Sequence, residues 1–298
     1  IDPPSTKSIQ DGFKTLEELG AIRKPKKNRP RKGRSGGRPG HALSRMGRTM
    51  ARLPMDPKLS RILIEAARKG CLDEACIIAT ALTVSDVRQR PSDKAQAADQ
   101  QHAAFKDPDS DFITLLNIWK AYKAAEKKLR SRSKKIRFCQ EHFLSFKRLR
   151  EWNEICHQIG KMLKEHGIAN QAARPAPDGA GHKQAHSPLY TALHQSFLAG
   201  YLSNIARKKE KNLFAAARGR QAMIFPGSGL FNKNCEWIVA AEYVKTSQLF
   251  ARSCARIDPG WLEPMAGSLC VYSHSSPRRE KKQGRVMVDE QVTLYGLV

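Results

Sequence analysis

The side chains that could do chemistry in this chain do not have the spacing that a catalytic site requires. A phosphate-binding loop needs Gly-x-x-x-x-Gly-Lys-Ser/Thr, because backbone N–H groups and the lysine must converge on the phosphates, and no segment has this pattern. The glycine-rich segment 33–40 lacks the Lys-Ser/Thr pair and follows no predicted strand. The carboxylates of Asp73-Glu-Ala-Cys76 could bind a metal, but they lie on the solvent side of a predicted amphipathic helix. We interpret this segment as an ordinary exposed acidic turn.

The candidate metal ligands and nucleophiles are equally isolated. His182 and His186 have the spacing of metal ligands without a cysteine partner. Cys156 and His157 are adjacent on a predicted helix, so their side chains diverge by about 100°. Ser228 lies between two glycines, but the full Gly-x-Ser-x-Gly pattern of a nucleophile elbow is not met. We therefore predict that the chain itself has no catalytic residue, no metal site and no cofactor site.

The cysteines and the apolar segments indicate the compartment. Seven cysteines include no Cys-x-x-Cys pair and mostly lie in apolar patterns, which favours reduced, buried thiols over a disulfide scaffold. No apolar run approaches the ~20 residues of a membrane helix, and we expect no signal peptide. We expect a cytoplasmic protein without a membrane partner. Ile1 as first residue and the strand-like run ending at Val298 predict a part of a longer protein.

The positive charge of the chain is large and concentrated in two segments. Lys and Arg number 53 against 28 Asp and Glu, a net charge of +25. Residues 23–48 hold eleven of these cations and residues 127–137 hold seven, and neither segment has an acid. This patchiness indicates a polyanionic partner, most often nucleic acid. Segment 23–48 is also rich in Gly and Pro, which predicts a flexible basic loop; a solvated insertion without a binding role has the same composition.

Capping signals and apolar periodicity predict a helical first part of about 205 residues. Asp56 before Pro57 is a typical helix start, and Ser110 can cap the next long helix. Besides the helix that Ser110 begins, the predicted helices run over 8–21, 46–53, 57–69, 72–84, 92–106, 137–166 and 189–205. Residues 170–188 are rich in Ala, Pro, Gly and His, which is typical of a linker.

The pattern changes from about residue 212 to short apolar runs separated by turn residues. Runs at 222–225, 237–244 and 248–257 predict strands of a small antiparallel barrel. Two more predicted strands, 284–289 and 291–297, close the chain.

Several longer motifs follow one another along the chain. They include Leu16-Glu-Glu-Leu-Gly-Ala-Ile22, Met46-Gly-Arg-Thr-Met-Ala-Arg-Leu-Pro-Met-Asp-Pro57, Asp111-Phe-Ile-Thr-Leu-Leu-Asn-Ile-Trp119, Ile224-Phe-Pro-Gly-Ser-Gly-Leu-Phe231, Glu242-Tyr-Val-Lys-Thr-Ser247 and Ala255-Arg-Ile-Asp-Pro-Gly-Trp-Leu-Glu-Pro264. In their order, the chain resembles the region after the two motor domains of DEAH-box RNA helicases of the bacterial HrpA type over nearly its whole length.

This resemblance implies a multi-domain α+β fold, with a mostly α N-terminal part followed by a small antiparallel OB-like β-barrel. Residues 1–55 would form a degenerate winged helix that contains the basic loop 23–48. Residues 56–205 would form a helical ratchet domain with the linker 170–188. Residues 206–270 would form the barrel, and 271–298 would begin a further C-terminal strand region.

The resemblance also implies a function. Motor domains before Ile1 would hydrolyse ATP with Mg²⁺, while this region grips single-stranded RNA, and the motor domains would be its partners. A stand-alone basic adaptor that binds RNA or the ribosome is the alternative. A hydrolase or nuclease is disfavoured, because no paired carboxylates occur in a strand or loop.

Single-stranded RNA is bound by Lys or Arg along the phosphates and by stacking or polar groups at the bases. The turn 225–230 offers backbone N–H groups and a hydroxyl, and 245–247 lie at a strand end, where loops of such barrels bind oligonucleotides. The candidate RNA-binding residues are Ser228, Lys245, Thr246, Ser247, Arg252, Arg137, Lys147 and Arg150. A satisfied turn explains 246–247 equally well, and a solvated helix face is the commoner role for cations such as those at 137–150. All four tryptophans are predicted to be core residues.

Overall fold

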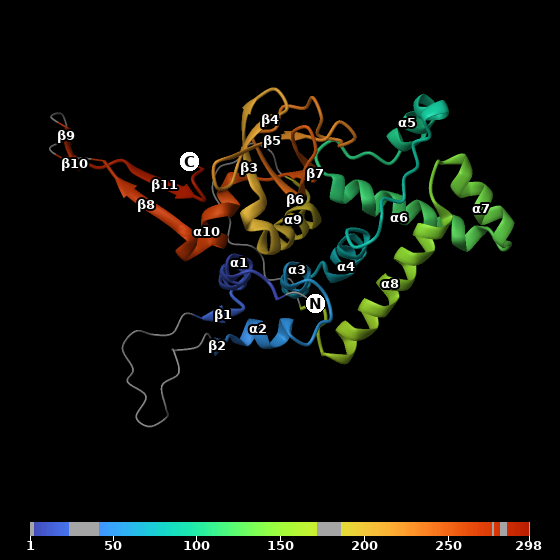
Figure 1. Ribbon diagram of the computed structural model, residues 1–298, viewed down its shortest axis with the longest axis horizontal. Helices are drawn as coiled ribbons and strands as arrows, with labels where there is room; N and C mark the ends of the chain where they lie inside the picture. Colours follow the sequence, from blue (N-terminus) through green and yellow to red (C-terminus); the bar gives the residue numbers. More distant parts are fainter. Residues whose placement is uncertain (1–2, 24–41, 172–185, 276, 281–284, 298) are drawn as a thin grey trace.

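The computed structural model describes residues 3–23, 42–171, 186–275, 277–280 and 285–297. The central part of the basic loop, 24–41, and most of the predicted linker, 172–185, lie outside the described residues. Among the described residues, helices predominate up to Tyr201 and a barrel follows them (Figure 1). In the described part of the chain, no helix is long and apolar enough to span a membrane.

The N-terminal segment consists of helix α1 (Thr6–Glu18), strand β1 (Ile22–Arg23), strand β2 (Ala42–Leu43) and helix α2 (Arg45–Met50). The two strands pair antiparallel. Leu19, Ala21 and Met50 form a small buried core that packs this segment against Ile64 of the following helix, Pro57–Arg68. The described residues 3–23 and 42–55 hold two helices and one two-residue strand pair, so the winged helix stays a prediction.

The helical part then follows with seven α-helices among the described residues. They are α3 (Pro57–Arg68), α4 (Leu72–Ala81), α5 (Ala95–Ala103), α6 (Asp111–Lys128), α7 (Arg132–Glu141), α8 (Phe146–Glu165) and α9 (Pro188–Tyr201). The predicted starts at Asp56 and Ser110 are confirmed, because each side chain accepts a hydrogen bond from a backbone N–H of its first turn. The buried Trp152 and Phe112 are among the largest side chains of the core.

The single helix predicted over 137–166 is wrong, because the chain forms two helices there. Phe143, between α7 and α8, has a φ of 51°, which the α-helix does not allow. The N–H of Leu144 turns back to the carbonyl of Cys139 at 2.7 Å, and the Ser145 side chain caps α8. Apolar residues continue at helical spacing through the turn, since both helices pack on one core, and periodicity therefore missed the break.

Five strands form a closed barrel in the order β3-β4-β5-β7-β6. They are β3 (Ile205–Glu210), β4 (Leu213–Ala216), β5 (Arg220–Ile224), β6 (Trp237–Lys245) and β7 (Leu249–Arg256). The pair β5–β7 is parallel and the other pairs are antiparallel. The predicted barrel is confirmed, but its first two strands were missed. The predicted helix over 189–205 continued past Tyr201, whereas Ile205 already belongs to β3.

The C-terminal segment projects from the barrel as a two-stranded ribbon (Figure 1). After the short helix α10 (Leu262–Ala266), strand β8 (Cys270–His274) pairs antiparallel with β11 (Glu290–Leu294). Beyond them, β9 (Arg278–Glu280) pairs with β10 (Arg285–Met287). The strands expected over 284–289 and 291–297 are therefore present in shortened form, as β10 and β11.

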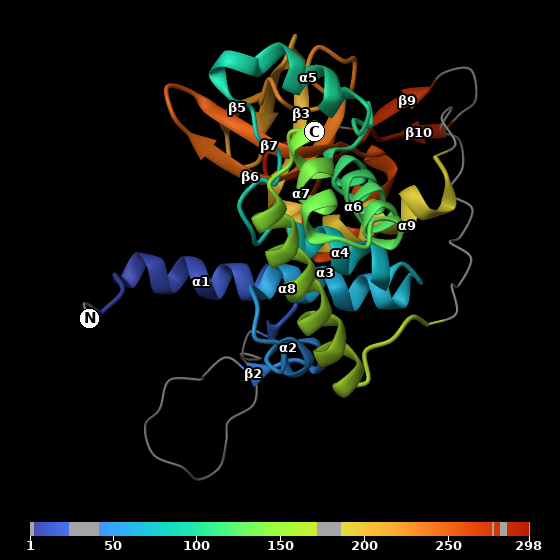
Figure 2. The ribbon, with the colours of Figure 1, turned by 90° about the vertical axis from the view of Figure 1, so that its right-hand side faces the viewer.

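One apolar core joins the helical part to the barrel. Leu63 of α3 and Phe197 of α9 belong to the same buried cluster as Ile205, Val239 and Ala255 of the barrel. Helix α9 lies between the two parts, beside α3 and β6 (Figures 1 and 2). Because this core is continuous, side chains from the helices and from the barrel hold fixed positions relative to one another.

Candidate nucleic-acid interface

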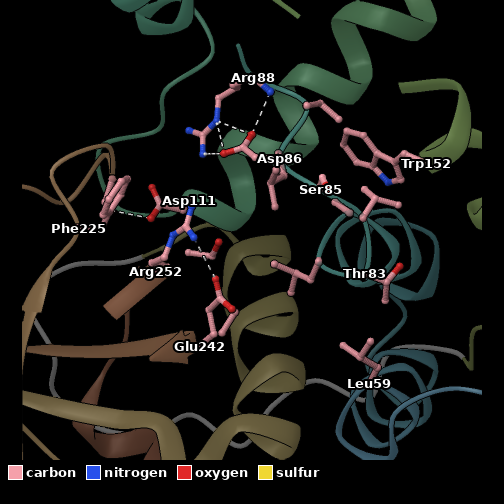
Figure 3. A pocket seen from close by; sticks show the side chains of 18 of the residues that line it. Leu59, Thr83, Ser85, Asp86, Arg88, Asp111, Trp152, Phe225, Glu242 and Arg252 are labelled. Carbon is pink, nitrogen blue, oxygen red and sulfur yellow. Dashed lines mark hydrogen bonds and ion pairs between the residues drawn. The ribbon is translucent and has the colours of Figure 1, made fainter. Parts of the chain in front are cut away.

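A cleft of about 580 Å³ lies between the helical part and the barrel (Figure 3). One wall is the chain that leaves α4, residues 81–88, together with the start of α3. The other wall is the turn after β5 and the middle of β6 and of β7. The charged side chains of its lining are Asp56, Lys58, Asp86, Arg88, Asp111, Glu242 and Arg252. Four acids and three cations therefore line one opening.

The wall from the helical part is organised by Asp86 and Arg88. The Arg88 guanidinium donates two hydrogen bonds to the Asp86 carboxylate, from Nε at 3.0 Å and from Nη2 at 2.8 Å. Arg148 of α8 donates a hydrogen bond to the Asp86 carbonyl at 2.6 Å, which holds this loop against α8. Burial works to raise the pKa of Asp86, but the hydrogen bonds and charge of Arg88 outweigh it and hold that pKa below its usual value.

The barrel wall carries a cation beside an aromatic ring. The guanidinium of Arg252, on β7, lies 5.0 Å from the centroid of the Phe225 ring. Glu242 of β6 forms an ion pair with it at 3.7 Å. Phe225 is 39% exposed, and its ring meets that of Phe250 edge to face at 6.1 Å. The positive charge of Arg252 also lowers the pKa of Asp86 across the cleft, so the two walls interact electrostatically.

Below the cleft, Asp111 at the start of α6 fastens the barrel turn. Its carboxylate accepts hydrogen bonds from the Ser228 hydroxyl at 2.6 Å, the Gly229 N–H at 2.8 Å and the Cys254 N–H at 2.8 Å. The expectation that the turn 225–230 offers available N–H groups is therefore wrong at four positions. The N–H groups of Phe225, Ser228, Gly229 and Leu230 all have intramolecular acceptors.

The structure separates the candidate RNA-binding residues into three places. Ser228 and Arg252 line the cleft, and Ser228 is buried with its hydroxyl bound to Asp111. Lys245, Thr246 and Ser247 are exposed at the β6–β7 turn, which lies three residues, or roughly 10 Å, beyond Glu242. The Thr246 N–H donates to the Gln248 carbonyl at 2.9 Å, so the turn is internally satisfied at this position.

The other three candidates lie on the helical part and outside the cleft lining. Arg137 is on α7, where it pairs with Glu141 at 2.8 Å. Arg150 is on α8 and pairs with Glu154 at 3.2 Å, and Lys147 is exposed one turn before it. The tryptophans are core residues, as expected: Trp152 and Trp237 are buried, and Trp119 and Trp261 are partly buried against the apolar clusters. His182 of the possible ligand pair lies outside the described residues.

Sequence reasoning missed most of the charged lining of the cleft. Asp86 and Arg88 belong to a stretch that reads only as a polar turn, and Glu242 lies in an alternating strand. The spacing Asp-x-Arg is a weak signal for the bidentate pair, because side chains two residues apart share a face of any extended segment whether or not they pair. Nothing local relates Arg88 to Arg252, since 163 intervening residues separate them in the sequence.

Two family models match these two walls. A helicase associated domain (HA2), ratchet-like, matches residues 56–115, and an oligonucleotide/oligosaccharide-binding (OB)-fold matches residues 193–269. The chain is also 40% identical over all its 298 residues to the ATP-dependent RNA helicase HrpA of Escherichia coli (strain K12). This chain is similar to the C-terminal region of HrpA-type helicases.

The HrpA-type match covers the whole chain but only a part of each relative. The chain spans 21% of the Escherichia coli relative and 21% of the HrpA homolog of Haemophilus influenzae, to which it is 39% identical over 298 residues. It is 26% identical over 246 residues, 81% of this chain and 19% of the relative, to the pre-mRNA-splicing factor ATP-dependent RNA helicase prp22 of Schizosaccharomyces pombe. The ratchet-like part and the barrel expected from the sequence are thus matched by family models over residues 56–115 and 193–269.

Proposed function

We propose that this chain is the part of an ATP-dependent DEAH-box RNA helicase that grips single-stranded RNA, and that the RNA lies across the cleft between the helical part and the barrel. The observation that carries the proposal is the meeting of Arg88, Arg252 and Phe225 at one opening, from parts of the chain held together by a common core. Cations beside an exposed aromatic ring are what a single strand requires.

The two arginines have different freedom to bind a phosphate. Arg88 is held by a bidentate pair with Asp86. The ion pair of Arg252 with Glu242 is longer, at 3.7 Å, and both side chains are solvent-exposed, at 39% and 57%. Such an exposed pair is worth well under about 1 kcal/mol, so a phosphate can replace Glu242 at little cost. Arg252 is therefore the cation that we expect to exchange partners as RNA moves.

ATP and Mg²⁺ belong, in this proposal, to motor domains elsewhere in the parent protein, since no phosphate-binding loop occurs in these 298 residues. The names of three relatives describe them as ATP-dependent RNA helicases. The motor domains of the same protein are the proposed partners and the cytoplasm is the proposed compartment. The role of this chain is binding, and we assign it no catalytic residue.

The test is fluorescence anisotropy with a short single-stranded RNA and a matched duplex at two salt concentrations. Arg252→Gln should weaken single-strand binding roughly 3- to 10-fold and lower the salt slope by about 0.7, the value of one phosphate contact. Lys161→Gln, on α8 and outside the cleft lining, removes an exposed cation of equal charge and is the control. An equal loss in both variants would reject the cleft as the binding site.

A stand-alone RNA- or ribosome-binding adaptor is the second candidate. Its support is the net charge of +25, which needs no motor domain to act. The match over the full chain to a helicase favours the first function. The parent reading frame separates them: Gly-Lys-Thr and Asp-Glu-Ala-His motifs upstream would establish the helicase, and their absence there would favour the adaptor.

A further inference from the structure

A cationic surface separate from the cleft lies where α6 turns into α7. We define the α6–α7 corner as residues 120–137. It contains a single acid, Glu126, and nine cations. The cations are Lys120, Lys123, Lys127, Lys128, Arg130, Arg132, Lys134, Lys135 and Arg137.

Most of these charges have no acidic partner in the described residues. Glu126 forms ion pairs with Lys123 and Lys135, and Glu141 of α7 forms an ion pair with Arg137. Five exposed cations around the turn form no ion pair with any described residue. They are Lys127, Lys128, Arg130, Arg132 and Lys134. Like charges this close repel one another in the unbound protein, and a polyanion relieves that repulsion.

The corner is remote from the cleft. Helix α6 begins at Asp111, on the floor of the cleft, and ends at Lys128 in the corner. Its 18 residues span roughly 26 Å at about 1.5 Å per residue. Figure 1 shows α7 at the edge of the molecule, with the length of α6 between it and the barrel strands. A ligand in the corner therefore need not occupy the cleft.

The corner presents charge without a surface for bases to stack on. Its aromatic side chain, Tyr122, belongs to a buried cluster, and the neighbouring Phe138 packs against the same cluster; neither is exposed. Single strands are bound through unstacked bases on exposed rings, whereas double-stranded RNA is bound mostly through its shape and phosphates. Five exposed cations around a turn, without an exposed ring, therefore fit double-stranded RNA better than a single strand.

We propose that the α6–α7 corner binds the phosphate backbone of double-stranded RNA, at a site separate from the single-strand cleft. The corner acts by counterion release and reads no sequence. The two sites together would hold a junction between duplex and single strand, but duplex binding by the corner is independent of the function proposed for the cleft.

The test compares two variants of equal net charge in the 298-residue chain. The corner variant carries Lys127→Gln, Lys128→Gln, Arg130→Gln, Arg132→Gln and Lys134→Gln. The control carries five changes at exposed lysines elsewhere: Lys7→Gln, Lys14→Gln, Lys161→Gln, Lys164→Gln and Lys233→Gln. Affinity for a blunt RNA duplex and for a single strand of equal length is measured by anisotropy at two salt concentrations.

The corner variant should lose roughly 10-fold or more in duplex affinity, with a salt slope smaller by about 2 to 4, and less than about 2-fold in single-strand affinity. Equal duplex loss in the control would make net charge the cause and overturn the proposal. Equal loss for the single strand would make the corner an extension of the cleft path, which also overturns it. If the cleft proposal is wrong, only the affinities for single-stranded RNA would reveal it, and the duplex affinities would still test the corner.

A footprint on the unaltered chain keeps the proposal falsifiable if the variant does not fold. Lysine acetylation read by mass spectrometry should show Lys127, Lys128 and Lys134 protected by the duplex and not by the single strand. Lack of protection by the duplex overturns the proposal. Protection by an acidic polypeptide such as poly-glutamate, without protection by the duplex, would assign the corner to a protein partner instead.

Discussion

The Ser228 hydroxyl donates a 2.6 Å hydrogen bond to Asp111, the first residue of α6, across 116 intervening residues. This contact ties the barrel turn to a helix N-terminus, where a carboxylate is also favoured by the helix dipole. It explains why the cleft has a fixed floor. It also explains why Ser228, the most distinctive hydroxyl of the glycine-rich turn, is buried instead of facing the opening.

Asp111→Ala should destabilise the fold by about 2–4 kcal/mol, because it leaves the Ser228 hydroxyl and the buried Cys254 N–H without an acceptor. Chemical denaturation followed by circular dichroism measures the loss. Asp93→Ala, at an exposed position, should change stability by less than about 0.5 kcal/mol. A loss at Asp111 no larger than at Asp93 would show that the contact does not support the fold.

The tight approach of α9 to α3 depends on Gly200. A Cβ at this position would lie 2.5 Å from the Lys58 carbonyl oxygen and 2.6 Å from Cγ1 of Ile62. Gly200→Ala should therefore lower the free energy of unfolding by about 1–3 kcal/mol through overpacking. Gly160→Ala, on α8 with open space around its Cβ, should raise it by up to about 1 kcal/mol. Thermal melts of both variants measure these changes in stability. A change in the same direction for both variants would contradict the close approach at Gly200.

Buried His194 should make the stability of the fold depend on pH. Its Nδ1 donates to the Tyr190 carbonyl and its Nε2 accepts from the Ser110 hydroxyl, both at 2.7 Å, which suits the neutral ring. Burial lowers the pKa of His194 from 6.5 to about 3. The unfolded chain therefore binds a proton at a pH where the folded chain does not, and stability is lost as the pH falls from 6.5 toward 3.

The expected slope from this residue is about 1.4 kcal/mol per pH unit over that window. Urea denaturation at pH 7, 6, 5 and 4 measures it. His194→Gln should remove this part of the slope while lowering stability at pH 7. His157→Gln, exposed on α8, should keep the slope. An unchanged slope in His194→Gln would refute the assignment.

Phe225→Ala should weaken single-strand RNA binding by about 1–3 kcal/mol, or roughly 5- to 150-fold, because it removes the ring on which a base can stack beside Arg252. The loss should be similar for RNAs of different sequence, since every base has a π-face. Phe13→Ala on α1, where the ring is 42% exposed compared with 39% for Phe225, is the matched control. Anisotropy titrations in which both variants lose affinity equally would exclude stacking at Phe225.

Local chemistry made several elements predictable. The helix starts at Asp56 and Ser110 follow from side chains that bond N–H groups two or three residues away, so a single sequence contains the whole interaction. The buried tryptophans and cysteines follow from apolar neighbours at helix and strand spacing. The break at Phe143 left no such signal, because the apolar pattern is continuous through it.

The sequence by itself determined the helical part followed by a barrel, the patchy positive charge and the lack of a phosphate-binding loop, because these depend on composition and on neighbours within a few turns. The tertiary structure alone decided which groups face the cleft. It set Arg88 opposite Arg252 and buried Ser228 against Asp111. Such pairings join residues more than a hundred positions apart, and only the packing of the shared core brings them together.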